Sequence, residues 1–558
     1  MPLVKTSILL LLTLSFANVW AISTWSRDCK NETPEPVFGV MVGKLPSWLQ
    51  GRLTRNGPGR RKFGDTEMKH MFDGLAMLHQ VHIFNGSASY RSKFLKSETL
   101  KKNLAANRIV VGEFGTEAFP DPCADLFQSW SSWFTPITDE HDMTDNCGVN
   151  ILQVHDELVA MTETETVRIV HPETLDTLGD GVSYKDFVAI QRATAHPHVD
   201  HDGTVYNLGS AVSTSGPMYT IVKLPNGKIQ NATVVSAITA RWRFNPGYQH
   251  SFAITENYFV IVETPLTMNV GRAVMFLLGQ GRPSDMLVWH EGEKTRFRVI
   301  NKHTGVELPT VYYAESYFAF HHVNAYEKDG ALIMDVGRAE HGRLVVDSLF
   351  IENIEKTPSD QTKIISHTEL TRFIIPITGV KEANVGKELV SHIEDAKLQS
   401  ADVSNEIERA TAVKTADGEV YMEGLRINPN FIELPRINYK YNGLWYRYVY
   451  GISKTDRSME FSTLIKIDTV TGQEWKWSDD NYACQEPVFV PNPDGKEEDD
   501  GVVLSLLLHY DDTRKVTFLV LNAQDMTEIS RVVFETEGVV TPSFHGQFVR
   551  PGDDFHFY

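Results

Sequence analysis

The segment "ATAHPHVDHDGTVYNLG", residues 193–209, carries three histidines within six positions: His196, His198 and His201. The neutral imidazole ring is a good ligand for iron, copper, zinc and nickel. A buried histidine can also serve the fold alone, by donating a hydrogen bond to a backbone carbonyl. The segment therefore raises the question of which of the three, if any, binds a metal.

Three more histidines stand in comparable contexts far along the chain: His250 in "YQHSFAIT", His321 in "AFHHVNAYE" and His545 in "TPSFHGQFV". From His196 onward they are separated by 54, 71 and 224 residues, so no local rule such as an i, i+4 pair on a helix joins them. Each lies at a predicted strand edge or turn. In a β-propeller such edges meet at the central axis, where distant histidines can converge.

The elements that would position these histidines are short strands. Runs such as "NYFVIVETP", "GALIMDVG", "GVVLSLLLHY" and "KVTFLVLNA" are rich in Val, Ile and Phe and are bordered by turn residues. Helical periodicity is rare, and 125–134 is the best helix candidate. The sequence predicts an all-β fold, either a propeller or stacked sheets, although no repeat of 40–50 residues marks a short-bladed propeller. We expect a polar surface insertion over 376–412 and a charged turn between two strands at 492–501.

Composition and the N-terminus bear on partners and compartment. The chain of 558 residues is 42% hydrophobic, enough for a large core, and its net charge of −19 without a basic block argues against nucleic acid. Lys5, the apolar run 8–16 and a small-residue site ending at Ala21 predict a signal peptide over 1–21, and hence the secretory pathway or the extracellular space. An uncleaved signal anchor is the alternative. Four cysteines are too few for a disulfide scaffold, although Cys123 and Cys147 could pair.

Several longer phrases occur in an order that resembles one family. They are "LTRNGPG" (53–59), "FDGLAMLH" (72–79), "EFGTEAFPDPC" (113–123), "TETETVRIVHPETL" (162–175), "IELPRINY" (432–439) and "CQEPVFVPNPDGKEEDDGVVLS" (484–505). Together with the four histidine phrases they resemble the animal branch of the carotenoid cleavage oxygenases, over about 35–558. The resemblance implies a lead-in over 22–34 and one domain over 35–558. That domain would be a seven-bladed β-propeller with long irregular blades and a loop and helix cap over an iron site.

The resemblance also implies a ligand set. One Fe²⁺ per chain would be held by His196, His250, His321 and His545, with the first histidine of "HPH" and of "FHH" as the ligand. His198, His201 and His322 would then not bind. Glu163, Glu433 and Glu486 match glutamates that hydrogen-bond the other ring nitrogen of such ligands, which fixes the ring and offsets part of the metal charge.

The activity that the resemblance implies is cleavage of a polyene C=C bond by O₂, with retinal-like carbonyl products and, in the insect relatives, coupled trans-to-cis isomerisation. Thr162, Tyr248 and Phe114 match positions near the iron or the cleft, and core packing is their alternative role. Two other hypotheses stay open: an O₂-independent retinoid isomerohydrolase and a secreted carotenoid or retinoid carrier without turnover. We expect membrane contact at 126–134 and 273–289, with core burial as the alternative. The signal peptide departs from the family, and it puts the role of Cys123 in doubt.

Overall fold

The computed structural model describes residues 23–119, 144–277, 281–356, 367–399, 409–454 and 460–552. The expected signal peptide, the helix candidate at 125–134 and Cys123 lie outside these residues. In the described part Cys29, Cys147 and Cys484 are buried thiols, and Cys147 Sγ donates to the carbonyl oxygen of Thr166 at 3.3 Å.

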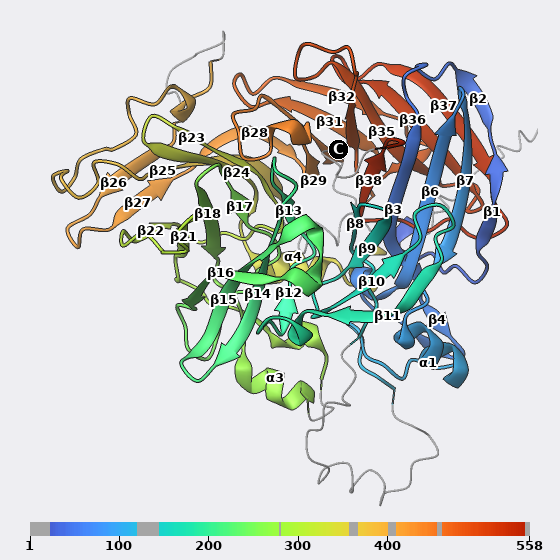
Figure 1. Cartoon of the computed structure of the whole chain (residues 1–558), viewed down its shortest axis with the longest axis horizontal. Coiled ribbons are helices and arrows are strands. Elements are labelled where there is room, and N and C mark those ends of the chain that lie inside the picture. Colours follow the sequence, from blue (N-terminus) through green and yellow to red (C-terminus); the bar gives the residue numbers. More distant parts are fainter. Residues whose placement is uncertain are drawn as a thin grey trace, which may run out of the picture.

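Seven main sheets are arranged around one axis as the blades of a β-propeller, which confirms the fold expected from the resemblance (Figure 1). The first blade contains β1 (Thr33–Phe38), β7 (Ser87–Phe94), β6 (Leu75–Phe84), β3 (Gly51–Arg60) and β38 (His545–Val549). The second contains β8 (Asn150–Val154), β9 (Glu157–Met161), β10 (Thr166–Val170) and β11 (Thr177–Ser183). The third contains β12 (Arg192–Ala193), β13 (His198–Val199), β14 (Val205–Ser213), β15 (Gly216–Leu224) and β16 (Thr233–Thr239).

The remaining blades follow the chain around the ring. The fourth contains β17 (Ala253–Ile254), β18 (Tyr258–Glu263), β21 (Thr295–Asn301), β22 (Tyr312–Ala314), β27 (Val420–Glu423) and β26 (Thr411–Lys414). The fifth contains β23 (His322–Lys328), β24 (Ala331–Ala339), β25 (Thr368–Pro376) and β28 (Leu425–Phe431). The sixth contains β29 (Glu433–Arg436), β30 (Tyr448–Ser453), β31 (Thr463–Asp468) and β32 (Glu474–Ser478). The seventh contains β33 (Tyr482–Cys484), β34 (Val488–Pro491), β35 (Gly501–His509), β36 (Lys515–Asn522), β37 (Glu528–Glu535) and β2 (Val40–Gly43).

Both ends of the described chain take part in closing the ring. The last strand, β38, pairs with β3 in the first blade, with His545 opposite Asn56, and β2 pairs with β37 in the seventh. Closure of this kind joins the first and last blades and protects strand edges. Two short hairpins lie outside the blades: β4 (Lys62–Phe63) with β5 (Thr66–Glu67), and β19 (Leu266–Met268) with β20 (Leu287–Trp289).

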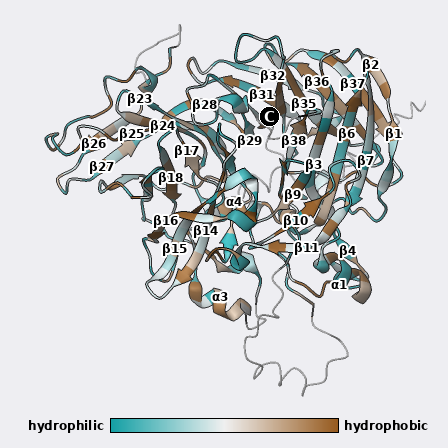
Figure 2. Ribbon diagram, viewed as in Figure 1, coloured by the Kyte–Doolittle hydropathy of each residue, from teal (hydrophilic) through white to brown (hydrophobic). Residues whose placement is uncertain are grey.

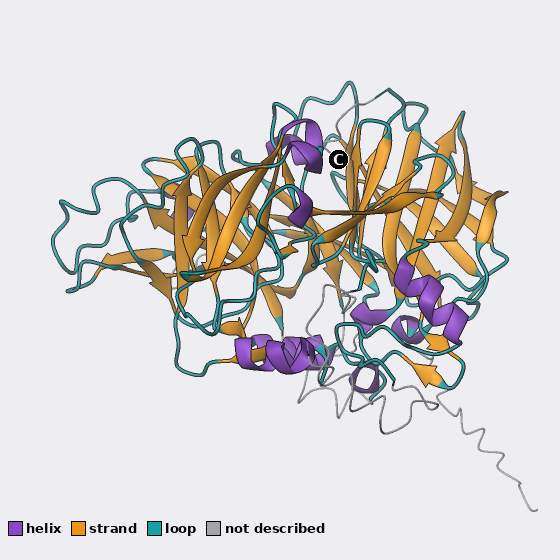
Figure 3. Cartoon of the chain, turned by 60° about the horizontal axis from the view of Figure 1, so that its bottom comes forward, coloured by secondary structure: helices purple, strands orange, loops and turns teal. Residues whose placement is uncertain are grey.

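The helices in the described residues are short, and strands make up most of the molecule (Figure 3). They are α1 (Glu98–Ala106), α3 (Val270–Leu277), α4 (Gly342–Ser348) and α5 (Ile351–Ile354). Within this part of the chain no helix has the length and apolar character needed to cross a bilayer.

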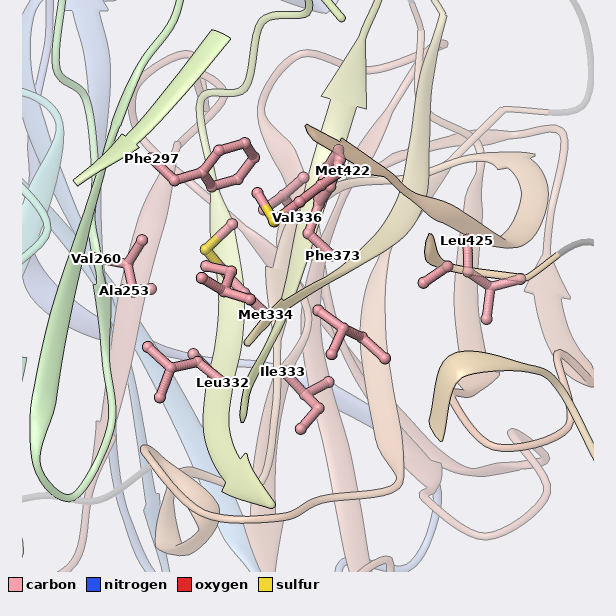
Figure 4. Packing of buried hydrophobic residues seen from close by; sticks show 14 of the residues in the cluster. Ala253, Val260, Phe297, Leu332, Ile333, Met334, Val336, Phe373, Met422 and Leu425 are labelled. Carbon is pink, nitrogen blue, oxygen red and sulfur yellow. The ribbon is translucent and has the colours of Figure 1, made fainter. Parts of the chain in front are cut away.

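Blades pack face to face through continuous apolar runs. On β24, Leu332, Ile333, Met334 and Val336 are all fully buried, because both faces of this strand are covered (Figure 4). Such a run differs from the alternation of a half-exposed strand. Apolar residues accordingly colour many strands, while polar residues mark much of the outer loops (Figure 2).

The polar stretch 376–412 differs from the surface insertion that we expected. Between β25 and β26 its described part is largely loop with one short turn, η7 (Glu394–Ala396), yet Val380, Val390 and Ile393 are buried in the core cluster of the fourth and fifth blades. Isolated apolar anchors of this kind leave no periodic signal in the sequence. The charged turn near 492–501 does separate two strands, β34 and β35.

Candidate metal centre

The four predicted ligands come together at the propeller axis. His196 lies between β12 and β13, His250 precedes β17, His321 directly precedes β23, and His545 opens β38. The ring centroids of neighbouring imidazoles are 4.6 Å apart for His196 and His250 and for His196 and His545, and those of His321 and His545 are 5.2 Å apart. Because each ring comes from a different blade, the cluster depends on the whole ring of blades rather than on any local motif.

The ring nitrogens fit a metal ion. Nε2 of His196 lies 3.0 Å from Nε2 of His250. Two imidazole nitrogens about 2.1 Å from one metal and at right angles to each other would be about 3.0 Å apart. Nε2 of His321 is buried without a hydrogen-bond partner among the described residues, and the ligand atoms of His196, His321 and His545 lie within 4.8 Å of one another. Lone pairs that face one another in a buried space favour a cation between them.

His196, His250 and His545 are held in the neutral form that a metal requires. Burial, together with repulsion from His250, His545 and His321, lowers the pKa of His196 well below its usual range. Burial lowers the pKa of His545 to about 4, although the Glu486 carboxylate acts in the opposite direction. Neutral rings therefore offer their lone pairs at physiological pH without first losing a proton.

The three predicted glutamates lie behind three of the four rings. Nδ1 of His250 contacts Glu163 Oε1, Nδ1 of His321 lies 2.7 Å from Glu433 Oε2, and Nδ1 of His545 lies 2.7 Å from Glu486 Oε1. Because a carboxylate only accepts, each Nδ1 must carry the proton, which leaves Nε2 as a lone pair directed away from the glutamate. Such contacts fix both the tautomer and the direction of a metal-binding ring.

Arginines, which the sequence analysis did not assign, pair with two of these glutamates. Arg192 donates to Glu163, while Arg55 and Arg436 lie 3.7 Å and 3.8 Å from Glu486. Burial alone would raise the pKa of both carboxyls, but the arginines and the histidines outweigh it and lower each pKa to about 2.

Glu433 differs from the other two glutamates. In the described part of the chain its ion-pair partner is His321, and no arginine pairs with it. Burial opposes its ionisation, and the interactions with His321 and the backbone N–H of Leu434 nevertheless lower its pKa. Of the three glutamates, Glu433 is therefore the one whose negative charge is not paired with an arginine in the described part of the chain.

The three neighbouring histidines that we did not expect to bind metal, His198, His201 and His322, make hydrogen bonds elsewhere in the fold. His198 contacts Asn442 Oδ1 through Nδ1 at 3.0 Å and the carbonyl oxygen of Phe252 through Nε2 at 2.9 Å. His201 Nε2 lies 3.0 Å from the carbonyl oxygen of Asn442, and His322 Nδ1 lies 2.8 Å from Ser251 Oγ. Both nitrogens of His198 are thus engaged away from the cluster, whereas His196 belongs to it.

A cavity of about 240 Å³ opens beside the cluster, and His250, His321 and His545 form part of its wall. The wall is mostly apolar and aromatic; its members include Trp25, Met71, Phe72, Phe320, Phe431, Phe461 and Phe544. Val345 and Ser348 of α4 and the following Leu349 also line it, so this helix covers the cavity near the centre of the ring (Figure 1).

The three weaker sequence candidates all reach this cavity. Thr162, Tyr248 and Phe114 line it, and the Phe114 ring lies 5.6 Å from that of Phe72. Tyr248 has a further contact, because its hydroxyl donates to Glu163 Oε1 at 2.8 Å and so supports the partner of His250.

Sequence reasoning missed another group in the cavity wall, the carboxyl of Glu113. It is buried and accepts a hydrogen bond from Thr144 Oγ1 at 2.6 Å. Burial raises its pKa well above the usual range, which favours the neutral acid. The phrase "EFG" drew attention to Phe114, and the neighbouring acid carried no signal of its own in the sequence.

A propeller whose axis gathers four histidines, three of them backed by glutamate carboxylates, defines a protein with a non-haem metal centre. The family model described as RPE65, retinal pigment epithelial membrane protein, matches residues 26–550. The chain belongs to this family of carotenoid oxygenases.

Individual relatives agree with this assignment. The mouse protein named β,β-carotene 15,15′-dioxygenase is 38% identical over 536 residues, which cover 94% of this chain and 91% of the relative. The carotenoid isomerooxygenase of Drosophila melanogaster is 34% identical over 580 residues, covering 94% and 92%. Among solved structures, a cobalt-substituted apocarotenoid oxygenase from Synechocystis has a TM-score of 0.72 at 22% identity, with coverage of 94% of this chain and 98% of that one, and therefore supports the fold.

Proposed function

We propose that this protein is a non-haem iron dioxygenase that cleaves a C=C bond of a carotenoid with O₂ to give two carbonyl products. One observation carries the proposal: in a cluster of four histidines, three form part of the wall of an apolar, aromatic cavity. Ferrous iron held by His196, His250, His321 and His545 would supply the activation of O₂. The names of the mouse and Drosophila relatives support carotenoids as the substrate class.

The cavity suits a polyene because it selects by shape rather than by polar contacts. A hydrocarbon chain offers no hydrogen-bonding group along its length, so orientation must come from walls such as Phe72, Phe320 and Phe544. Aromatic faces also stabilise positive charge that develops on a conjugated chain. The same walls exclude water, which would compete with O₂ for the reacting carbon atoms.

The protonation states in the cavity match the balance of this reaction. Cleavage of one C=C bond by one O₂ places one oxygen atom in each carbonyl product, and no net proton or external electron is consumed. Glu163 and Glu486 stay ionised and hold Nδ1–H groups, while burial favours the neutral form of Glu113. These side chains therefore position and balance charge without having to deliver a proton.

Two further parts of the proposal concern the secretion of the protein and the source of its substrate. We infer that residues 1–21 act as a signal peptide, on the strength of Lys5 and the apolar run 8–16. We also infer that α3 contacts lipid or a lipid carrier, because Val274 and Met275 on this helix are 46% and 45% exposed. In the second half of the 273–289 stretch, Leu287 is buried in β20.

The decisive experiment incubates iron-loaded protein with a panel of carotenoids under isotopically labelled O₂ and identifies products by chromatography and mass. We expect two carbonyl products, each with one labelled oxygen, and none from metal-free protein or without O₂. Retinol release from retinyl esters without O₂ would instead favour an isomerohydrolase. Polyene binding without any product would favour a carrier, and a cis product would add the isomerase activity named in the Drosophila relative.

A further inference from the structure

The N-terminal segment of the described chain is fixed in place within the fold. Residues 23–27, "STWSR", contain the short turn η1 (Thr24–Ser26), and Trp25 at its centre is only 4% exposed. Specific side-chain contacts hold this segment against the propeller. Here the contacts come from Glu460, whose Oε1 accepts from Ser23 Oγ at 2.5 Å and from the backbone N–H of Thr24 at 2.9 Å, and whose Oε2 accepts from Thr24 Oγ1 at 2.8 Å.

The segment is also fixed on the other side of Trp25. The Arg27 guanidinium is buried and donates to the carbonyl oxygen of Val540 at 2.9 Å and to that of His509. Glu460 is half-buried and Arg27 is buried, and taking such groups out of water is costly unless they are paired. Placing one on each side of a single tryptophan therefore indicates that the position of this indole matters.

Trp25 lines the same cavity as the predicted ligands His250, His321 and His545. Its ring stacks on Phe544 with centroids 5.5 Å apart and planes 19° apart, and it meets the edge of Phe461 at 6.5 Å. Phe544 directly precedes His545, and Phe461 directly follows Glu460. Glu460, which holds the segment, is therefore adjacent in the chain to a ring that contacts the indole. The other ring, Phe544, is adjacent to a predicted metal ligand.

We propose that Trp25 is a specificity-determining residue of this site and that Glu460 is the positioning residue that holds it. The indole, stacked on the ring of Phe544, limits how far a polyene can advance along the cavity. It thereby selects which double bond lies opposite the metal centre. This inference rests on the proposed cleavage of polyenes, and it assigns to the N-terminal segment a role in substrate register rather than only in folding.

The test compares Trp25→Ala, Trp25→Phe and Glu460→Gln with a matched control, Trp445→Ala, whose indole is 45% exposed and lies outside the cavity wall. The readout is the ratio of the main cleavage product to products from neighbouring double bonds. Filling a hydrophobic pocket typically discriminates by about 10–200-fold. We expect Trp25→Ala to lower this ratio by about tenfold or more, Trp25→Phe to lower it less, and Trp445→Ala to leave it at the wild-type value.

Glu460→Gln distinguishes positioning from simple stability. The amide turns one acceptor into a donor that cannot accept from Thr24 Oγ1, so we expect the product ratio to shift in the same direction as for Trp25→Ala, at an unchanged iron content. A lower melting temperature with the wild-type product ratio would show that Glu460 only stabilises the fold, and would overturn its positioning role.

Polyene binding to metal-free protein, followed by quenching of tryptophan fluorescence, separates this inference from the cleavage proposal. We expect about tenfold weaker binding for Trp25→Ala and unchanged binding for Trp445→Ala. If wild type binds in this way but forms no product, the cleavage proposal fails while the assignment of Trp25 to the polyene wall stands. Wild-type affinity and wild-type product ratio in Trp25→Ala would overturn the assignment.

Discussion

Replacing Glu433 with glutamine tests how the buried charges of the centre are balanced. Glu433 Oε2 accepts from His321 Nδ1 at 2.7 Å, and among the described residues no arginine pairs with it, in contrast to Glu163 and Glu486. Glutamine has nearly the same size and retains an acceptor for the ring. The substitution therefore removes mainly the negative charge that compensates a bound metal.

The expected magnitudes differ between Glu433 and Glu486. Loss of such a partner usually lowers metal affinity by about 10–100-fold, or ~1.4–2.8 kcal/mol. We expect Glu433→Gln to lie near the upper end, because no arginine already shares its charge. In metal-free protein the same change leaves no unpaired cation. Glu486→Gln instead leaves Arg55, whose side chain is 0% exposed, without its carboxylate, and breaking a buried pair costs about 3–5 kcal/mol.

Two measurements separate these effects: thermal unfolding of the metal-free proteins, and metal affinity by competition with a chromogenic chelator. We expect metal-free Glu433→Gln to unfold near the wild-type temperature and to bind metal much more weakly. Metal-free Glu486→Gln should unfold several degrees lower. Equal loss of thermal stability in the two metal-free variants, or a Glu486→Gln protein as stable as wild type, would refute the assignment of charge balance.

Further predictions address the ligands, protonation and processing. His196→Ala should abolish stoichiometric metal binding in a metal assay of purified protein, whereas His198→Ala should retain most of it. Tyr248→Phe removes the hydroxyl donor to Glu163, so kcat should fall by less than the roughly 10–100-fold expected for loss of a whole carboxylate partner, at unchanged metal content. Burial lowers the pKa of His79 to about 3, so below pH 6.5 the unfolded state binds this proton and the folded state does not. This difference lowers the free energy of unfolding by about 1.4 kcal/mol for each unit by which the pH is lowered. In denaturant titrations of metal-free protein at pH 7 and pH 5, His79→Gln should therefore reduce the loss of stability between the two pH values. In insect cells the secreted protein should begin at Ile22 by N-terminal sequencing, and cytosolic protein with the first methionine intact would contradict the signal peptide.

The histidine cluster shows what the sequence could and could not predict. Spacing alone did not join His196 to His545, 349 residues away, and only the resemblance of whole phrases placed both in one site. Strand texture predicted the all-β class, because apolar runs bordered by turn residues depend on local sequence. The number of blades came from the resemblance, since blades of unequal length leave no repeat to count.

The partners of the site depended on contacts that no local pattern encodes. Arg55 meets Glu486 across 431 residues because β3 and β38 close the ring beside the seventh blade. Trp25 could not be assigned from a segment that resembled a lead-in, because its role depends on Glu460 and Phe544, from distant parts of the chain. Burial, which raises the pKa of Glu113, is likewise a property of the assembled cavity.

The arrangement of ligands and carboxylates ties the metal centre to ring closure. His545 opens β38, which pairs with the first blade, and the carboxylate that orients its ring, Glu486, lies between β33 and β34 of the seventh. His321 precedes the fifth blade, and its partner Glu433 opens the sixth. Each of these imidazole rings is therefore oriented towards the metal site only when neighbouring blades are packed together. Since a metal binds strongly only to histidines that are oriented in this way, its binding free energy adds to the stability of the closed propeller and not to that of any single blade.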